Sequence, residues 1–226
     1  HSIVNSYDPS NQAHYVGSKN SNDKKLYDLS INRIYDTYLP ESHYKNAENK
    51  LLRLISSEFS KNANHIIYPS ELFNKIGKKM KKTSFLRVAA DLNIPIFCGA
   101  TSDSELGLNL LKYRKLNDYK IILDEIGDID NFADKIEKYD KYGIVIIGGG
   151  VPRNWSQQIF PYLEQIKNKR NSGYDYGVRI HTATEYDGGL SGCTISENVS
   201  WGKYSKNNDS KNVSVWVDST IGFPLL

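Results

Sequence analysis

The segment Tyr142-Gly143-Ile144-Val145-Ile146-Ile147-Gly148-Gly149-Gly150 joins a short apolar run to three consecutive glycines. Such a run predicts a buried strand. A helical pattern follows the glycines at residues 155–166, and Pro161 should kink or delay this helix. Four similar runs lie at residues 94–98, 119–123, 176–180 and 213–217. Helical patterns at residues 106–113 and 132–139 lie between these runs. Three helices are predicted earlier in the chain: one over residues 44–59, one that begins at Pro69 and one that begins at Ser84. Strands that alternate with helices indicate an α/β fold, a parallel sheet with helices on both faces.

Polar residues follow each predicted strand, and ligands bind at the carboxyl ends of the strands in such folds. In chain order they are Asp103, Asp124, Gly148 to Gly150, Thr182 with Asp187 and Gly188, and Asp218. The glycines could let a dinucleotide approach the backbone, but they do not form GxGxxG, so a turn that needs positive φ is the alternative. Asp103 and Asp218 could hold ribose hydroxyls or cap helices. We expect these five loops to meet at one edge.

Composition limits the classes of partner. The chain has 226 residues and a formal net charge of +3, with lysines spread among acidic residues. This distribution argues against a nucleic-acid partner, and no apolar stretch is long enough to span a membrane. Cys98 and Cys193 are far apart and the histidines lack metal-binding spacing, so we expect no disulfide framework, no metal site and a cytoplasmic location. Residues 1–25 are polar and predict a loose arm, which leaves residues 26–226 as a single catalytic domain.

The segment Glu197-Asn198-Val199-Ser200-Trp201-Gly202-Lys203 brings a carboxylate, an indole and a lysine close together. A lysine that attacks an imine must be a free amine, and its ordinary pKa of about 10.4 must be lowered by apolar surroundings. Trp201 could supply an apolar wall, Gly202 could let a substrate approach, and Glu197 could bind a cationic substrate. A lysine exposed to solvent is the alternative, but a tryptophan and a glycine beside it favour a site.

Residues 182–192 read Thr-Ala-Thr-Glu-Tyr-Asp-Gly-Gly-Leu-Ser-Gly, and they precede Glu197 and the tetrad Ser200-Trp201-Gly202-Lys203. Together with residues 31–34, the Asp103 loop, residues 147–151 and residues 218–226, this pattern resembles the deoxyhypusine synthase family. The similarity extends from about residue 14 to the end of the chain. The tetrad with the upstream Asp-Gly and Glu is its most specific part.

The resemblance implies a Rossmann-like, NAD-binding catalytic domain that transfers a 4-aminobutyl group from spermidine to a lysine of translation initiation factor 5A. NAD would take and return a hydride, and Lys203 matches the lysine that holds the butylimine. The matching substrate-binding positions are Glu197, Trp201, Gly188, Gly189, Leu190, Asn154 and Leu108. The matching cofactor-binding positions are Asp103, Gly149, Thr182, Ala183, Asp187, Asp218 and Ser219. The family also implies a homotetramer whose active sites are built across dimer interfaces.

Several substrate positions depart from the family pattern. Leu108 replaces an acidic residue, Gly189-Leu190 replaces a serine and an aspartate, and Asn154 replaces a histidine. Each lost anion should remove a charge-assisted bond of about 1.5–3 kcal/mol to a polyamine. The upstream Thr-Ser-Asn and Gly-Gly cofactor segments of the family have no counterpart, so we expect the N-terminal part of the family domain to be absent.

These departures leave other functions open. One is an enzyme of the same family that uses small amines, either a homospermidine synthase type that takes putrescine or a type that takes agmatine. Another is a weakly active paralogue that binds and completes an active partner subunit. An unrelated Rossmann-like dehydrogenase is a further alternative, and it would lack a covalent lysine.

Overall fold

A computed structural model describes residues 14–169, 173–206 and 211–226 of the chain. The chain divides into two compact units, and each is described by itself. The first unit runs to Phe97 and resumes over Thr101–Asp124, and the second comprises Cys98–Ala100 and Glu125–Leu226. Within the described ranges, no helix is both long enough and apolar enough to cross a membrane.

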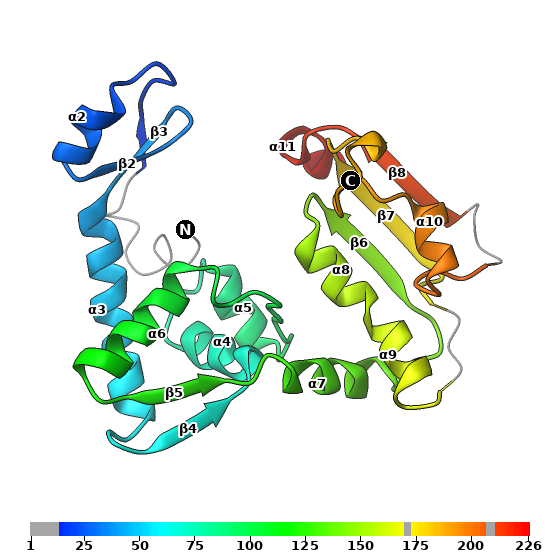
Figure 1. Ribbon diagram of the computed structural model, residues 1–226, viewed down its shortest axis with the longest axis horizontal. Helices are drawn as coiled ribbons and strands as arrows, with labels where there is room; N and C mark the ends of the chain where they lie inside the picture. Colours follow the sequence, from blue (N-terminus) through cyan, green and yellow to red (C-terminus); the bar gives the residue numbers. More distant parts are fainter. Residues whose placement is uncertain (1–13, 170–172, 207–210) are drawn as a thin grey trace. The chain divides into compact units, whose positions relative to one another are not determined.

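The first unit contains an antiparallel sheet and a parallel pair of strands with helices (Figure 1). The antiparallel sheet has the order β1-β3-β2, and β4 pairs with β5 in parallel. The elements are β1 (Tyr15–Val16), α2 (Asp23–Asp28), β2 (Ile31–Ile34), β3 (Thr37–Pro40), α3 (Glu41–Glu58), β4 (Asn64–Ile67), α4 (Pro69–Lys78), α5 (Phe85–Asp91), α6 (Glu105–Leu116) and β5 (Lys120–Leu123). Leucine and isoleucine side chains of α3, α4 and α6 form its core with Tyr113 and Ile121.

Part of the predicted loose arm has regular structure. Residues 1–13 lie outside the described residues, but Tyr15 and Val16 pair with Tyr38 and Thr37 of β3. The helix α2 then begins at Asp23, where the side chain of Asn22 accepts a hydrogen bond from the backbone N–H of Lys25. Backbone pairing and this cap order a polar segment that buries little apolar surface.

The strand predicted at residues 94–98 is not formed. Pro95 has no N–H to give to a sheet, and the N–H of Ile94 instead donates to the carbonyl oxygen of Ala89 at the end of α5. The position beside β5 is taken by β4, in the register Asn64↔Lys120 to Ile67↔Leu123. Asp103 therefore follows an irregular segment and not the end of a strand.

The second unit contains a three-stranded parallel sheet of order β6-β7-β8, whose strands lie side by side in Figure 1. Its elements are α7 (Gly127–Ile136), β6 (Gly143–Ile147), α8 (Val151–Gln157), α9 (Ile159–Gln165), β7 (Tyr176–His181), η1 (Glu185–Asp187), α10 (Ile195–Ser200), β8 (Asn212–Trp216), α11 (Ser219–Gly222) and η3 (Phe223–Leu225). The core joins Ala133, Ile159, Phe160 and Leu163 to Tyr174 and Tyr204. The predicted α/β class with parallel strands is confirmed.

The helical pattern at residues 155–166 is divided into α8 and α9, with the junction at Gln158. Pro161 is the third residue of α9. The first N–H groups of a helix have no acceptor within it, so proline is tolerated there. The predicted delay of this helix by Pro161 is therefore confirmed, and the break lies before the proline.

Candidate functional site

Lys203 is a buried lysine, with 7% of its surface exposed. Its Nζ donates a hydrogen bond of 2.8 Å to Oδ1 of Asn154 and lies 5.7 Å from the centre of the Trp201 ring. Burial is the main cause that lowers the pKa of Lys203, and the positive charge of Arg153 lowers it further. Cys193 and Glu197 act in the opposite direction and raise this pKa. Because burial disfavours the ammonium form, this amine is more readily neutral and nucleophilic than a lysine in solvent.

The chain reaches Lys203 through a turn that depends on glycine. Helix α10 ends at Ser200, and Gly202 has φ +69°, a conformation that side chains rarely adopt. The N–H of Lys203 then donates to the carbonyl oxygen of Asn198, and its own carbonyl oxygen accepts from the N–H of Tyr174. A Cβ at Gly173 would lie 2.8 Å from the carbonyl carbon of Lys203. Close backbone contact on both sides therefore holds the lysine in place.

A pocket of about 340 Å³ opens beside Lys203. Seven of its lining residues are those proposed from the sequence: Asn154, Gly188, Gly189, Leu190, Glu197, Trp201 and Lys203. Four further lining residues are Gln158, Glu185, Cys193 and Asn198. Glu185 and Asn198 lie within the segments 182–192 and 197–203 that the sequence already singled out, so their position next to candidate residues could have identified them. Gln158 lies at the junction of α8 and α9, and nothing in its local sequence singles it out.

Two buried arginines hold the wall of this pocket. Arg153 donates from Nη1 to the carbonyl oxygen of Cys193 over 2.9 Å and from Nη2 to that of Leu190 over 2.7 Å. Arg179 donates from Nη1 to the carbonyl oxygen of Cys193 over 2.7 Å and from Nη2 to that of Ser191. Burial and the charge of Arg153 lower the pKa of Arg179. The guanidinium groups therefore fix residues 190–193, from which Leu190 and Cys193 face the pocket.

Most of the proposed cofactor residues follow the strands of the second unit. Gly149 follows β6, Thr182, Ala183 and Asp187 follow β7, and Asp218 with Ser219 follows β8. Asp103 lies in the first unit, where Ser104, and not Asp103, caps α6. Leu108 also lies in the first unit and is 60% exposed on α6. These two residues are therefore outside the group of side chains that the second unit brings together.

The residues after the strands of the second unit have the chemistry that a dinucleotide requires. Gly148 and Gly149 have φ of +69° and +31°, and a Cβ added at Gly148 would meet no atom within 4 Å. Oδ1 of Asp187 accepts from Thr184, and Oδ1 of Asp218 accepts from the N–H and hydroxyl of Thr220. Asp218 thus caps α11, which was the alternative to a ribose-binding role. The other oxygen of each carboxylate can still accept a hydrogen bond from a ribose hydroxyl. The carboxylate oxygens and the open space at Gly148 are features that a dinucleotide such as NAD could use.

His181 has a structural position at the end of β7. It is buried, and its Nδ1 and Nε2 lie 3.1 Å from the carbonyl oxygen of Ala183 and from Oγ of Ser214. Its ring centre is 5.1 Å from that of Trp216. Burial, followed by the charge of Arg179, lowers the pKa of His181. The ring therefore links β7 to β8 in its neutral form.

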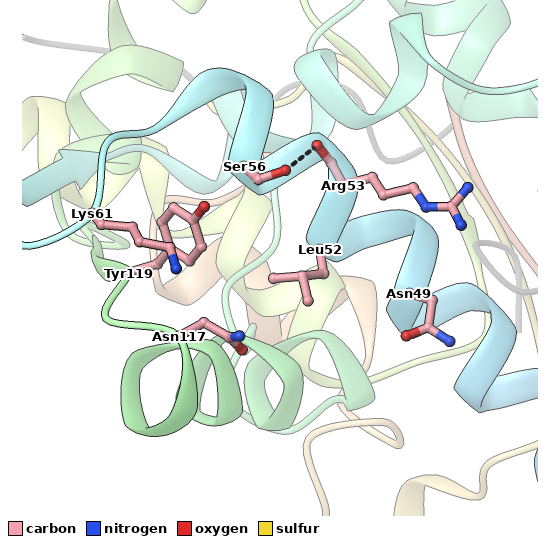
Figure 2. A pocket seen from close by; sticks show the side chains of 7 residues that line it. All are labelled: Asn49, Leu52, Arg53, Ser56, Lys61, Asn117 and Tyr119. Atoms are coloured by element: carbon pink, nitrogen blue, oxygen red, sulfur yellow. Dashed lines mark hydrogen bonds between the residues drawn. The ribbon is translucent and has the colours of Figure 1, made fainter.

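A second pocket, of about 550 Å³, lies in the first unit (Figure 2). Lys61 places its Nζ 5.7 Å from the centre of the Tyr119 ring, and the Ser56 hydroxyl donates to the carbonyl oxygen of Arg53. The lining residues are Asn49, Leu52, Arg53, Ser56, Lys61, Asn117 and Tyr119. Their charged side chains are cations, so this pocket is unsuited to an amine. Over the described part of the chain, no group of three or more metal-ligating side chains occurs.

Comparison with known proteins gives consistent matches. The family model for deoxyhypusine synthase matches residues 5–226. "Probable deoxyhypusine synthase 2" of Methanosarcina acetivorans is 35% identical over 219 residues, which cover 94% of this chain and 61% of the relative. The protein of the same name from Methanosarcina mazei is 34% identical, with coverage of 98% and 63%. "Deoxyhypusine synthase-like protein" of Chlorobaculum parvum is 34% identical, with coverage of 94% and 61%. The chain thus spans less than two thirds of the length of these relatives.

A solved structure has the same fold. The crystal structure of a candidate deoxyhypusine synthase from Entamoeba histolytica superposes with a TM-score of 0.55 and 21% sequence identity. The match covers 82% of this chain and 53% of the other. At this identity the superposition supports the α/β fold alone.

Proposed function

Because the chain belongs to the deoxyhypusine synthase family, we propose that it is an NAD-dependent transferase that passes a 4-aminobutyl group through an imine on Lys203. The observation that carries the proposal is the buried amine of Lys203, which faces a pocket with Glu197 and Trp201. A lysine with no chemical role has no need of such surroundings, since lysines are rarely buried without a partner charge.

Lys203 acts as the nucleophile. Its neutral Nζ attacks the C=N carbon of the oxidised donor, and the C–N bond to the leaving amine breaks as the proton passes to the leaving nitrogen. The butylimine then resides on Lys203 until the acceptor amine attacks the same carbon and releases the lysine. The chemistry that NAD supplies when bound is removal of a hydride from the carbon beside the donor nitrogen and its later return. Asn154 orients Nζ before attack through its 2.8 Å hydrogen bond.

The proposed NAD-binding residues of the second unit are Gly149, Thr182, Ala183, Asp187, Asp218 and Ser219, which follow its parallel strands. Asp103 and Leu108 remain proposed site residues of the first unit. Glu197 and Trp201 would bind the amine, Glu197 through its charge and Trp201 through its ring face.

We propose spermidine as the donor and a lysine of translation initiation factor 5A as the acceptor, in a homotetramer with sites across dimer interfaces. Small amines, such as putrescine or agmatine, are the second candidate substrates. The observation that favours them is the pocket lining itself, in which Gly189, Leu190 and Asn154 replace polar or charged residues of the family pattern. Retention of a buried Lys203 argues against a paralogue that only completes another subunit.

Borohydride trapping tests the proposal. The protein is incubated with NAD and spermidine, reduced, and digested for mass spectrometry; a butylamine adduct is expected on Lys203. Lys203→Arg should give no adduct, whereas Lys206→Arg, a matched change at an exposed lysine nearby, should give the adduct of the unchanged protein. Absence of an adduct with spermidine, putrescine and agmatine would refute the proposed transferase.

A labelled donor identifies the acceptor. Spermidine labelled in its butyl part is offered with the initiation factor and, separately, with free diamines. Label in the factor supports the protein acceptor. Label found only in small molecules would replace that acceptor with a diamine and leave the Lys203 chemistry intact.

A further inference from the structure

We propose that Glu185 is a specificity-determining residue of the Lys203 pocket, and that it selects amines with a second ammonium group at the far end of a short carbon chain. This inference rests on the proposed function, because it assigns the substrate class of the same pocket. Glu185 does not belong to the substrate positions that the family resemblance indicated.

The charges of the pocket lining motivate the proposal. Its carboxylates are Glu185 and Glu197, and its cation is Lys203. Glu197 belongs to α10, and its charge acts on both Lys203 and Cys193. Glu185 belongs to a different element, η1, and no hydrogen bond or ion pair of its side chain occurs in the described residues. The pocket therefore has one carboxylate whose charge acts on the lysine and, on another element, a second carboxylate that can bind a cation.

The position of Glu185 on η1 sets it apart from the other acidic residue of this element. Both Glu185 and Asp187 belong to η1, but only Glu185 lines the pocket. Glu185 is thus the carboxylate that η1 contributes to the lining. A carboxylate accepts a charge-assisted hydrogen bond from an ammonium group, and such bonds are stronger than those between neutral groups.

The backbone holds Glu185 at the pocket. A Cβ at Gly192 would collide with the carbonyl oxygen of Thr184 and lie 3.2 Å from Cα of Glu185, so η1 packs directly on the loop before α10. The Thr184 hydroxyl donates to Asp187 over 2.7 Å and closes the turn. The arginines that fix residues 190–193 therefore also limit where η1 can lie.

The rest of the lining suits a carbon chain between two charges. Trp201 presents an indole ring and Leu190 an aliphatic side chain, and both line the pocket. Methylene groups can pack against these surfaces while the ends of the molecule meet carboxylates. A diamine satisfies both ends, whereas a monoamine leaves Glu185 without a partner.

Calorimetric binding with 1,4-diaminobutane and butylamine tests the assignment, with NAD present. The unchanged protein should prefer the diamine. Glu185→Gln should weaken diamine binding about tenfold or more and leave butylamine binding within about twofold, as loss of one charge-assisted bond predicts. Glu185→Asp should recover part of the loss. Glu71→Gln, the same change at an exposed glutamate of the first unit, should behave as the unchanged protein.

Two results would overturn the inference: no preference of the unchanged protein for the diamine, or equal effects of Glu185→Gln on both amines. Thermal unfolding of each variant checks that the fold is kept. Borohydride trapping on Lys203 separates the two proposals. If no adduct forms but Glu185→Gln still abolishes diamine preference, the transferase proposal fails and the amine-binding role stands. If adducts form but Glu185→Gln leaves the diamine preference unchanged, the transferase proposal stands and the role of Glu185 fails.

Discussion

The carbonyl oxygen of Cys193 accepts hydrogen bonds from two buried guanidinium groups, those of Arg153 and Arg179. The two side chains are 4% and 2% exposed, and neither forms an ion pair with a carboxylate within the described residues. Backbone carbonyls of one loop thus solvate both charges. Because an unpaired buried cation is costly, this loop cannot move without exposing or stranding the arginines.

Arg153→Lys should loosen the pocket wall. A lysine has one ammonium group and cannot bridge the carbonyl oxygens of Leu190 and Cys193 as the planar guanidinium does. We expect the rate of adduct formation on Lys203 to fall about tenfold and the melting temperature to fall by a few degrees. Arg114→Lys, at an exposed site in the first unit, is the control. Identical behaviour of the two variants would contradict a role for the arginine clamp.

The rate of adduct formation on Lys203 should rise with pH and level off below the range of an ordinary lysine. The attacking amine must be neutral, and burial lowers its pKa, so the neutral form is reached at lower pH. Asn154→Asp puts a carboxylate where Nζ now meets an amide oxygen at 2.8 Å. This change stabilises the ammonium form and should move the midpoint up by about 1 unit or more. A midpoint that moves down, or stays in place, would contradict the contact.

The loss of unfolding free energy on Gly→Ala substitution should depend on the backbone conformation and the space around each glycine. Gly202→Ala has space, since an added Cβ would be 3.8 Å from Glu164, but its φ of +69° costs about 1–2 kcal/mol of unfolding free energy. Gly173→Ala should cost more, because φ is +78° and the Cβ would also collide with the backbone of Lys203 and Tyr204. Gly189→Ala meets no atom within 4 Å and should cost less than about 0.5 kcal/mol. Urea unfolding measures the order, and a different order would contradict the backbone contacts.

His181 should make the protein less stable in mild acid. Its pKa is lowered in the folded state, so the unfolded chain binds the proton more readily as pH falls below the ordinary histidine value of about 6.5. The contribution is fully present at pH above that value and is lost progressively below it. His181→Gln should reduce the fall in the urea midpoint between about pH 7.5 and 5.5. An unchanged fall would show that His181 is not the responsible group.

Local patterns predicted much of the fold. Apolar runs located β5, β6, β7 and β8 to within a residue or two, because the β-branched and aromatic side chains in these runs favour strands. The run at residues 94–98 was misleading because Pro95 cannot donate to a sheet. Strand β4 was missed because Asn64 and His65 shorten its apolar run to two residues. Strand formation there depends on pairing with β5, 56 residues away by the register Asn64↔Lys120.

Some contacts of the candidate site follow from the local sequence, and others depend on tertiary structure. The amino-acid sequence alone determined that Glu197, Trp201 and Lys203 stay close, because a short helix and a glycine turn span them. Only the tertiary structure decided that Asn154 meets Lys203, that Arg153 and Arg179 converge on Cys193, and that Glu185 faces the pocket. These contacts join residues separated by as many as 49 positions. Side-chain periodicity carries no information at such separations, since packing of whole elements determines which side chains meet.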